Sequence, residues 1–119
     1  MLTTKFIVLV LLAFVMADSP SLEVSPSNLF QKVGSKWGEI TYRIRLSKPG
    51  GICTGWVYPN LSLPKEEWPY RSSCRVVDRL YVEERWGGPV SPFQYIGEYV
   101  AFVQLTDGTL LVKKFQVLE

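Results

Sequence analysis

A strict alternation of apolar and polar residues runs through positions 39–47 and restricts this segment to a β-strand. The apolar positions, which are separated by single polar or charged residues, are Ile40, Tyr42, Ile44 and Leu46. Successive side chains of a strand point to opposite faces of a sheet, and β-branched and aromatic residues favour strands. The segment is therefore predicted to be a strand with one buried face.

The C-terminal part of the sequence predicts a β-hairpin. Two apolar-rich runs, 98–105 and 109–118, flank an Asp107-Gly108 turn signal, which is a strong short-range indication of a hairpin. We expect Leu105 to pair with Thr109 across a three-residue loop. This register puts one set of apolar side chains on a single face: Tyr99, Val103, Leu111 and Phe115.

Further strands are expected at 22–25, ending before Pro26, and at 52–58, where the side chain of Trp56 is expected in the core. Residues 28–37 have no clean period, and 74–84 read as one strand or two short strands bent near Asp78. Six or seven short strands without a helical period predict an all-β fold. We expect a small antiparallel β-sandwich, immunoglobulin-like in architecture, with a small β-barrel as the alternative.

The first 17 residues predict a signal peptide rather than part of the domain. Lys5 precedes ten apolar residues, 6–15, and Ala17 ends a short stretch that a signal peptidase reads. As a helix, ten residues rise about 15 Å, half of the roughly 30 Å hydrocarbon core, so stable membrane insertion is not expected. Cleavage after Ala17 leaves one domain, 18–119, which we expect to be secreted and extracellular.

The two cysteines of the chain, Cys53 and Cys74, predict one disulfide. A secreted chain meets an oxidising compartment, and an even cysteine count there indicates a crosslink rather than a metal or redox site. We expect the bond to join the end of one central strand to the start of the next, across a proline-rich loop. The alternatives are two free thiols or a disulfide to a second chain.

Two irregular segments, 59–72 and 85–92, are the expected binding loops. The first has three prolines, which disfavour a regular strand or helix, and loops of this length tend to be functional. The candidate binding residues in and beside the two loops are Trp68, Tyr70, Arg71, Arg75 and Trp86. Asn60-Leu61-Ser62 fits the acceptor pattern for N-linked glycosylation in a eukaryotic host, so Asn60 is a candidate modification site.

The residue inventory argues against an enzyme. The sequence has no histidine, which removes the usual general base and the commonest metal ligand. Glu83 and Glu84 are strand neighbours that point to opposite faces, so they cannot converge on one glycosidic bond. No phosphate-binding glycine loop is present, and we expect no metal and no cofactor. A net charge of +2 argues against binding of nucleic acid through bulk charge.

Three functional hypotheses remain, in this order. The first is a secreted binding protein that presents the 59–72 loop to an extracellular protein partner. The second is a secreted effector, a toxin or an inhibitor of a protease or channel, that presents Arg71 or Arg75. The third is a carbohydrate-binding module that stacks a glycan on Trp68 and Trp86.

Overall fold

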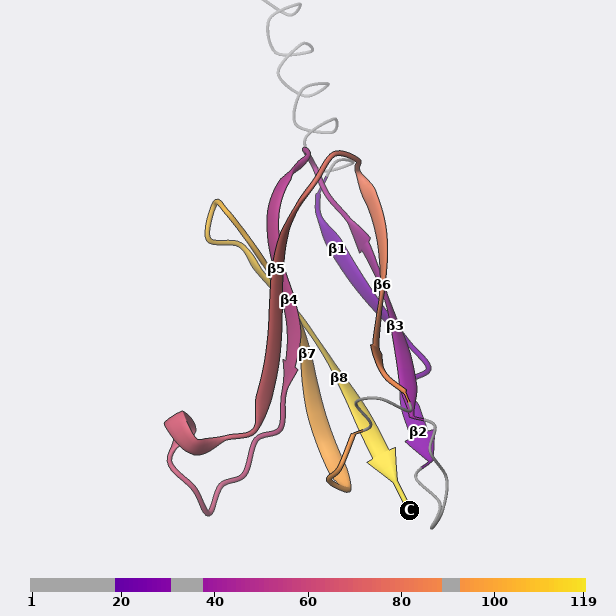
Figure 1. Cartoon of the computed structure of the whole chain (residues 1–119), viewed down its shortest axis with the longest axis vertical. Coiled ribbons are helices and arrows are strands. Elements are labelled where there is room, and N and C mark those ends of the chain that lie inside the picture. Colours follow the sequence, from indigo (N-terminus) through magenta and orange to yellow (C-terminus); the bar gives the residue numbers. More distant parts are fainter. Residues whose placement is uncertain (1–18, 31–37, 89–92) are drawn as a thin grey trace, which may run out of the picture.

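The computed structural model describes residues 19–30, 38–88 and 93–119, which form an all-β sandwich of two sheets (Figure 1). The predicted signal peptide and residues 89–92 of the second expected loop lie outside this described part. The elements are β1 (Ser21–Ser25), β2 (Asn28–Phe30), β3 (Glu39–Arg45), β4 (Gly50–Val57), the 3-10 helix η1 (Lys65–Glu67), β5 (Tyr70–Val77), β6 (Tyr81–Gly87), β7 (Gly97–Leu105) and β8 (Leu110–Leu118).

The order of the strands is that of an immunoglobulin-type sandwich. One sheet has the order β1-β3-β6, and the other has the order β2-β8-β7-β4-β5. Each neighbouring pair is antiparallel except β2 and β8, which run parallel. Immunoglobulin-type domains likewise put their first, second and fifth main strands in one sheet and strands C, F and G in the other. The predicted sandwich architecture is confirmed, and the barrel alternative is not adopted.

The alternation that predicted the first strand sets the core. In β3, Ile40, Tyr42 and Ile44 are fully buried, and Leu46 is buried just after the strand ends. The facing sheet covers them with inward residues from β4, β7 and β8, which include Ile52, Thr54, Tyr99, Ala101, Val103, Phe115 and Val117. The hairpin register is also as predicted, since the Leu105 amide donates to the Thr109 carbonyl over 2.9 Å.

Aromatic side chains fill one end of the core. The ring of Tyr99 lies 5.1 to 5.2 Å, between centroids, from the rings of Trp56, Phe93 and Phe115. Its hydroxyl donates to the carbonyl of Tyr95 and accepts from the amide of Tyr95, both over 3.0 Å. This arrangement is the tyrosine corner of immunoglobulin-type domains, in which a tyrosine near the start of strand F bonds the backbone upstream.

Two polar contacts join the sheets inside the sandwich. The Tyr42 hydroxyl of β3 donates to the carbonyl of Gly55 in β4 over 2.6 Å, and the Thr54 hydroxyl donates to a Glu84 carboxylate oxygen over 2.6 Å. Glu84 is half-buried and points inward, whereas Glu83 points outward, as expected for neighbours in a strand. These bonds satisfy groups that would be costly to bury unpaired.

Several predicted boundaries are wrong. Strand β5 begins at Tyr70, so Tyr70 and Arg71 stand on a strand rather than on the proline-rich loop, and that loop contains the 3-10 helix η1. Strand β6 continues to Gly87, so Trp86 also stands on a strand. The short strand β2 was not predicted. The break near Asp78 is real, but it carries the chain from one sheet to the other.

The predicted disulfide is confirmed, with the sulfur atoms of Cys53 and Cys74 2.06 Å apart. Its expected position is wrong. Both cysteines lie in the middle of their strands and are direct partners in the register of β4 and β5. Because strand pairing extends from the loop up to and beyond the cysteines, the bond crosslinks two neighbouring strands rather than bridging the ends of a loop.

Candidate functional site

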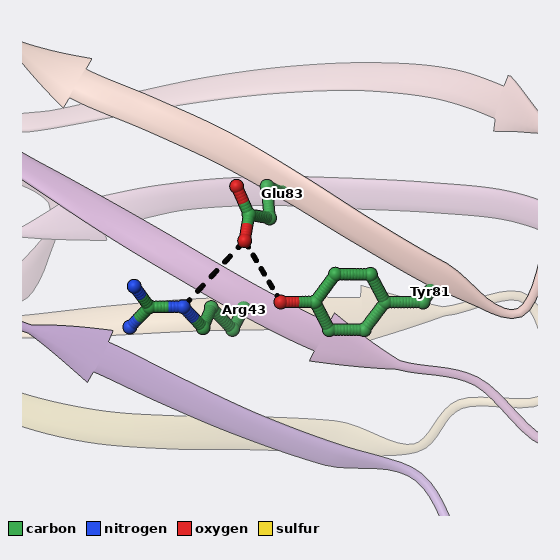
Figure 2. Close-up of polar contacts among 3 residues, drawn as sticks. All are labelled: Arg43, Tyr81 and Glu83. Atoms are coloured by element: carbon green, nitrogen blue, oxygen red, sulfur yellow. Dashed lines mark hydrogen bonds and ion pairs between the residues drawn. The ribbon is translucent and has the colours of Figure 1, made fainter.

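The outer side of the three-stranded sheet, which we name the charged face, carries charged side chains of both signs. Glu23, Arg43 and Glu83 stand side by side across β1, β3 and β6. Figure 2 shows the Glu83 carboxylate between the Arg43 guanidinium, 3.5 Å away, and the Tyr81 hydroxyl, which donates to it over 2.9 Å. This hydrogen bond raises the pKa of Tyr81. The charged face is therefore a polar surface on which Glu83 has two partners.

The outer side of the five-stranded sheet, which we name the apolar face, differs because its large exposed side chains are mainly apolar. Its large side chains are exposed although they are apolar, with exposed fractions of 84% for Val76, 65% for Tyr70, 59% for Phe30, 57% for Leu110 and 53% for Val112. The half-buried side chains of Val57, Val100 and Phe102 lie between them. Apolar residues thus occupy both sides of this sheet, although only the inner side meets the other sheet.

The strand register makes these residues one continuous surface. Val112 of β8 is paired with Phe102 of β7, which is paired with Gly55 of β4. Because Gly55 has no side chain, the Phe102 ring lies over its backbone, where an added Cβ would come within 2.9 Å of the ring. In the next row, Cys53 of the Cys53–Cys74 disulfide is paired with Gln104, which is paired with Leu110. The neighbouring rows hold an ion pair between Lys114 and Glu98, 3.6 Å apart.

A shallow hollow of about 390 Å³ lies at one end of the apolar face. Its outward-facing lining residues come from β4, β5 and the end of β7, and they are Gly51, Cys53, Cys74, Val76, Gln104 and Thr106. The hollow exists because Gly51 contributes no side chain, and a Cβ there would press on the Thr106 methyl at 3.0 Å. An apolar side chain of a partner fits a depression of this lining.

The structure brings three of the sequence-predicted residues together on β5. Tyr70 belongs to the apolar face, whereas Arg71 and Arg75 point to the other side of the strand, and all three side chains are exposed. Strand β5 is an edge strand, because β4 is its only neighbour among the strands of the described residues. Tyr70, Arg71 and Arg75 thus border a sheet edge rather than a loop.

The two predicted tryptophans lie elsewhere. The half-buried Trp68 indole N–H is shared between the carbonyls of Asn60, at 2.7 Å, and Leu63, at 3.1 Å, so it fastens the proline-rich loop. Trp86 points inward from β6, where its ring packs 6.3 Å from that of Tyr42. Its buried indole nitrogen has no partner among the described residues. Whether either tryptophan contacts a ligand stays a prediction.

The predicted glycosylation site has a defined local geometry. The Asn60 side-chain oxygen accepts from the Ser62 amide over 3.1 Å and from the Ser62 hydroxyl over 2.6 Å. This Asx turn fixes the carbonyl side of the amide group. In the following residue, Leu61, the side chain is almost fully exposed. The sequon therefore lies at the surface of the loop.

The sequence reasoning missed the β7–β8 contribution to the apolar face. The signal was present, because the predicted hairpin register puts Phe102, Leu110 and Val112 on the side opposite Tyr99 and Phe115. Apolar residues on both sides of a two-stranded unit indicate two buried or contacting surfaces.

Within residues 19–30, 38–88 and 93–119, no cluster of three or more histidine, cysteine, aspartate or glutamate side chains could hold a metal ion. In the same part of the chain, no helix has the length and apolar character needed to cross a membrane. Comparison with protein-family models gives no match, and comparison with curated proteins gives no significant match. The geometry therefore has to carry the functional argument.

Proposed function

We propose that this chain is a secreted, non-enzymatic binding protein that docks an extracellular protein partner on its apolar face. The observation that carries the proposal is the contrast between the two outer faces of one sandwich. The charged face is polar and holds the Arg43–Glu83 ion pair, whereas the apolar face exposes Val76, Leu110 and Val112. A contiguous exposed apolar surface typically marks a protein interaction site.

The size of the apolar face supports this role. Four of its strands have eight or nine residues and β2 has three. With strands about 4.8 Å apart and a rise of about 3.3 Å per residue, the sheet spans roughly 600 Å². Stable protein interfaces bury about 800 Å² of accessible surface on each partner, so the face is comparable in size to one side of such an interface. Its composition also fits, since the centres of interfaces are depleted of charge and enriched in aromatic side chains. Phe102 and Tyr70 supply the aromatic rings.

Secretion belongs to the same proposal. It is supported by the apolar N-terminal segment of the sequence and by the Cys53–Cys74 disulfide, because such bonds persist in oxidising compartments. We also propose that Asn60 is glycosylated in a eukaryotic host. A glycan on the proline-rich loop extends from the end of the β4–β5 pair, beyond the rows that hold Phe102 and the disulfide.

The test is a screen of the disulfide-intact protein against arrayed extracellular domains. Wild-type protein is compared with Val112→Lys, which puts a charge beside Phe102 in the apolar face without touching the core. The matched control is Thr41→Lys, which adds the same charge on the charged face. We expect binding that Val112→Lys reduces about 100-fold, since one buried unpaired charge outweighs the lost methyl contacts.

Two results would contradict the proposal. One is a partner whose affinity is the same for wild type and Val112→Lys. The other is a partner that Thr41→Lys releases while Val112→Lys does not, because this would place the interface on the charged face.

A further inference from the structure

The free edge of β5 presents unpaired backbone groups in a regular row. The Tyr58 amide donates to the Pro69 carbonyl over 2.8 Å, which makes these two residues a hydrogen-bonded pair of the β4–β5 ladder. Antiparallel ladders alternate such pairs with non-bonded ones. In the register of β4 and β5, Arg71, Ser73 and Arg75 therefore bond β4.

The remaining residues of the strand direct their backbone groups away from the sheet. These are Ser72, Cys74 and Val76, and in the described part of the chain β5 has no second neighbouring strand. The edge is eight residues long, contains no proline and is exposed almost throughout. Unless protected, an edge of this kind is a template for an added strand.

The side chains along this edge differ between its two sides. On the apolar face, Tyr70 and Val76 are the large residues, and the smaller Ser72 and Cys74 stand between them. On the other side, Arg71 and Arg75 are exposed, and neither guanidinium forms an ion pair with a described carboxylate. The edge therefore presents two arginines without a described ion-pair partner on one side and two large apolar side chains on the other.

We propose that β5 accepts an extended segment of a partner protein as an added strand, and that this segment carries two carboxylates four residues apart, flanked by apolar residues. Side chains of paired strands stand opposite one another on the same side of the sheet. A segment that has carboxylates opposite Arg71 and Arg75 then also has apolar residues opposite Tyr70 and Val76. The resulting pattern is apolar, acidic, three variable residues, acidic, apolar.

The same residues disfavour a second copy of this chain as the added strand. Antiparallel self-pairing that puts Tyr70 opposite Val76 also puts Arg71 opposite Arg75. Like charges directly opposite each other destabilise a strand pair, and inward or edge charges are a known protection against self-association. An acidic segment does not meet this repulsion. The β5 edge therefore favours pairing with an acidic strand over pairing with a second copy of itself.

This inference goes beyond the proposed function, because it concerns the backbone edge of β5 and the two arginines that point away from the apolar face, although Tyr70 and Val76 belong to both surfaces. The test titrates the ¹⁵N-labelled, disulfide-intact protein with the blocked peptide Val-Glu-Thr-Ser-Thr-Glu-Val. Two matched peptides replace both glutamates by glutamine or by lysine. We expect the acidic peptide to shift the amide signals of Ser72, Cys74 and Val76 most strongly, and the glutamine peptide to bind about tenfold more weakly.

A charge-reversed variant tests the same contacts through a gain of binding, which a variant that fails to fold would not show. Arg71→Glu combined with Arg75→Glu should lose affinity for the acidic peptide about tenfold and gain affinity for the lysine peptide. The control combines Arg45→Glu with Arg85→Glu on the charged face, which changes the net charge equally and should leave acidic-peptide binding unchanged.

The inference is overturned if the three peptides bind wild type equally, if none shifts the β5 amides, or if the charge-reversed variant fails to bind the lysine peptide. Each of these results leaves the apolar-face proposal standing, because Val112→Lys does not touch the edge.

Discussion

Cys53 and Cys74 are direct partners across β4 and β5, with Cα atoms 4.0 Å apart. They form a non-hydrogen-bonded pair, the kind in which opposite side chains approach most closely. Their disulfide faces outward in the apolar face, next to the hollow beside Gly51. Because β5 has one neighbouring strand, this crosslink at its middle ties the edge and the hollow to the rest of the sheet.

Replacing both Cys53 and Cys74 by alanine should destabilise the domain by about 3 kcal/mol, the chain-entropy estimate for a bond that closes a loop of this length. For a domain of about 100 residues this lowers Tm by roughly 12 to 24 °C. Thermal unfolding followed by circular dichroism measures the change. An unchanged Tm would show that pairing of β4 with β5 alone supplies the constraint.

The buried tyrosines predict a loss of stability at alkaline pH. Burial raises the pKa of Tyr99 to about 12, partly opposed by its hydrogen bond to Tyr95, and burial also raises the pKa of Tyr42. The folded state thus holds these protons more tightly than the unfolded state, in which tyrosine titrates near pH 10. Their contribution is complete below pH 10 and falls as the pH rises from about 10 toward 12.

Tyr99→Phe isolates this effect. At pH 8 the variant should be about 1 to 2 kcal/mol less stable than wild type, because it loses both bonds to Tyr95. At pH 11 the difference should shrink, since only wild type loses the tyrosine contribution. Urea unfolding at the two pH values measures it, and an equal difference at both would contradict the assignment.

Gly55→Ala should destabilise the sandwich by about 1 to 3 kcal/mol, as overpacking does elsewhere. An added Cβ would collide with the Arg71 carbonyl and press on the Phe102 ring. Gly38→Ala is the control, because its Cβ meets Phe93 at an ordinary 3.9 Å. Chemical denaturation of the two variants should separate them, and similar midpoints would argue against close packing of Phe102 over Gly55.

Expression in a eukaryotic secretory host should give a glycosylated protein that an N-glycosidase converts to a lighter form. Asn60→Gln and Ser62→Ala should each produce only the lighter form, whereas Ser62→Thr should keep the heavier one, because threonine preserves the acceptor pattern. Gel mobility and intact mass distinguish these outcomes. A single light form for wild-type protein would show that Asn60 is unoccupied.

The strands that sequence analysis predicted well have local signals. The period of two around Tyr42 and the Asp107-Gly108 turn define β3 and the β7–β8 register without help from the rest of the chain. The errors occur where long-range pairing overrides local composition. Tyr70 follows a proline-rich stretch, yet pairing with Val57 begins β5 there. The short strand β2 exists because Leu29 pairs beside Val117, a residue far away in sequence.

The candidate site was predicted only in part for a related reason. Tyr70, Arg71 and Arg75 were selected from their place near a loop, and they do lie together on one strand. Phe102, Leu110 and Val112 were overlooked, since a sequence period cannot say whether the second apolar side of a hairpin meets another sheet or solvent. That distinction appears only when the strands are assigned to sheets.

The most direct measurement of the central claim is carbene footprinting of the disulfide-intact protein, alone and bound to a partner found in the screen. Photolabelling marks exposed side chains, and bound surfaces lose label. We expect strong protection of Val76, Leu110 and Val112, with unchanged labelling of Arg45 and Arg85 on the charged face. Protection confined to the charged face, with Val76, Leu110 and Val112 still labelled, would contradict it.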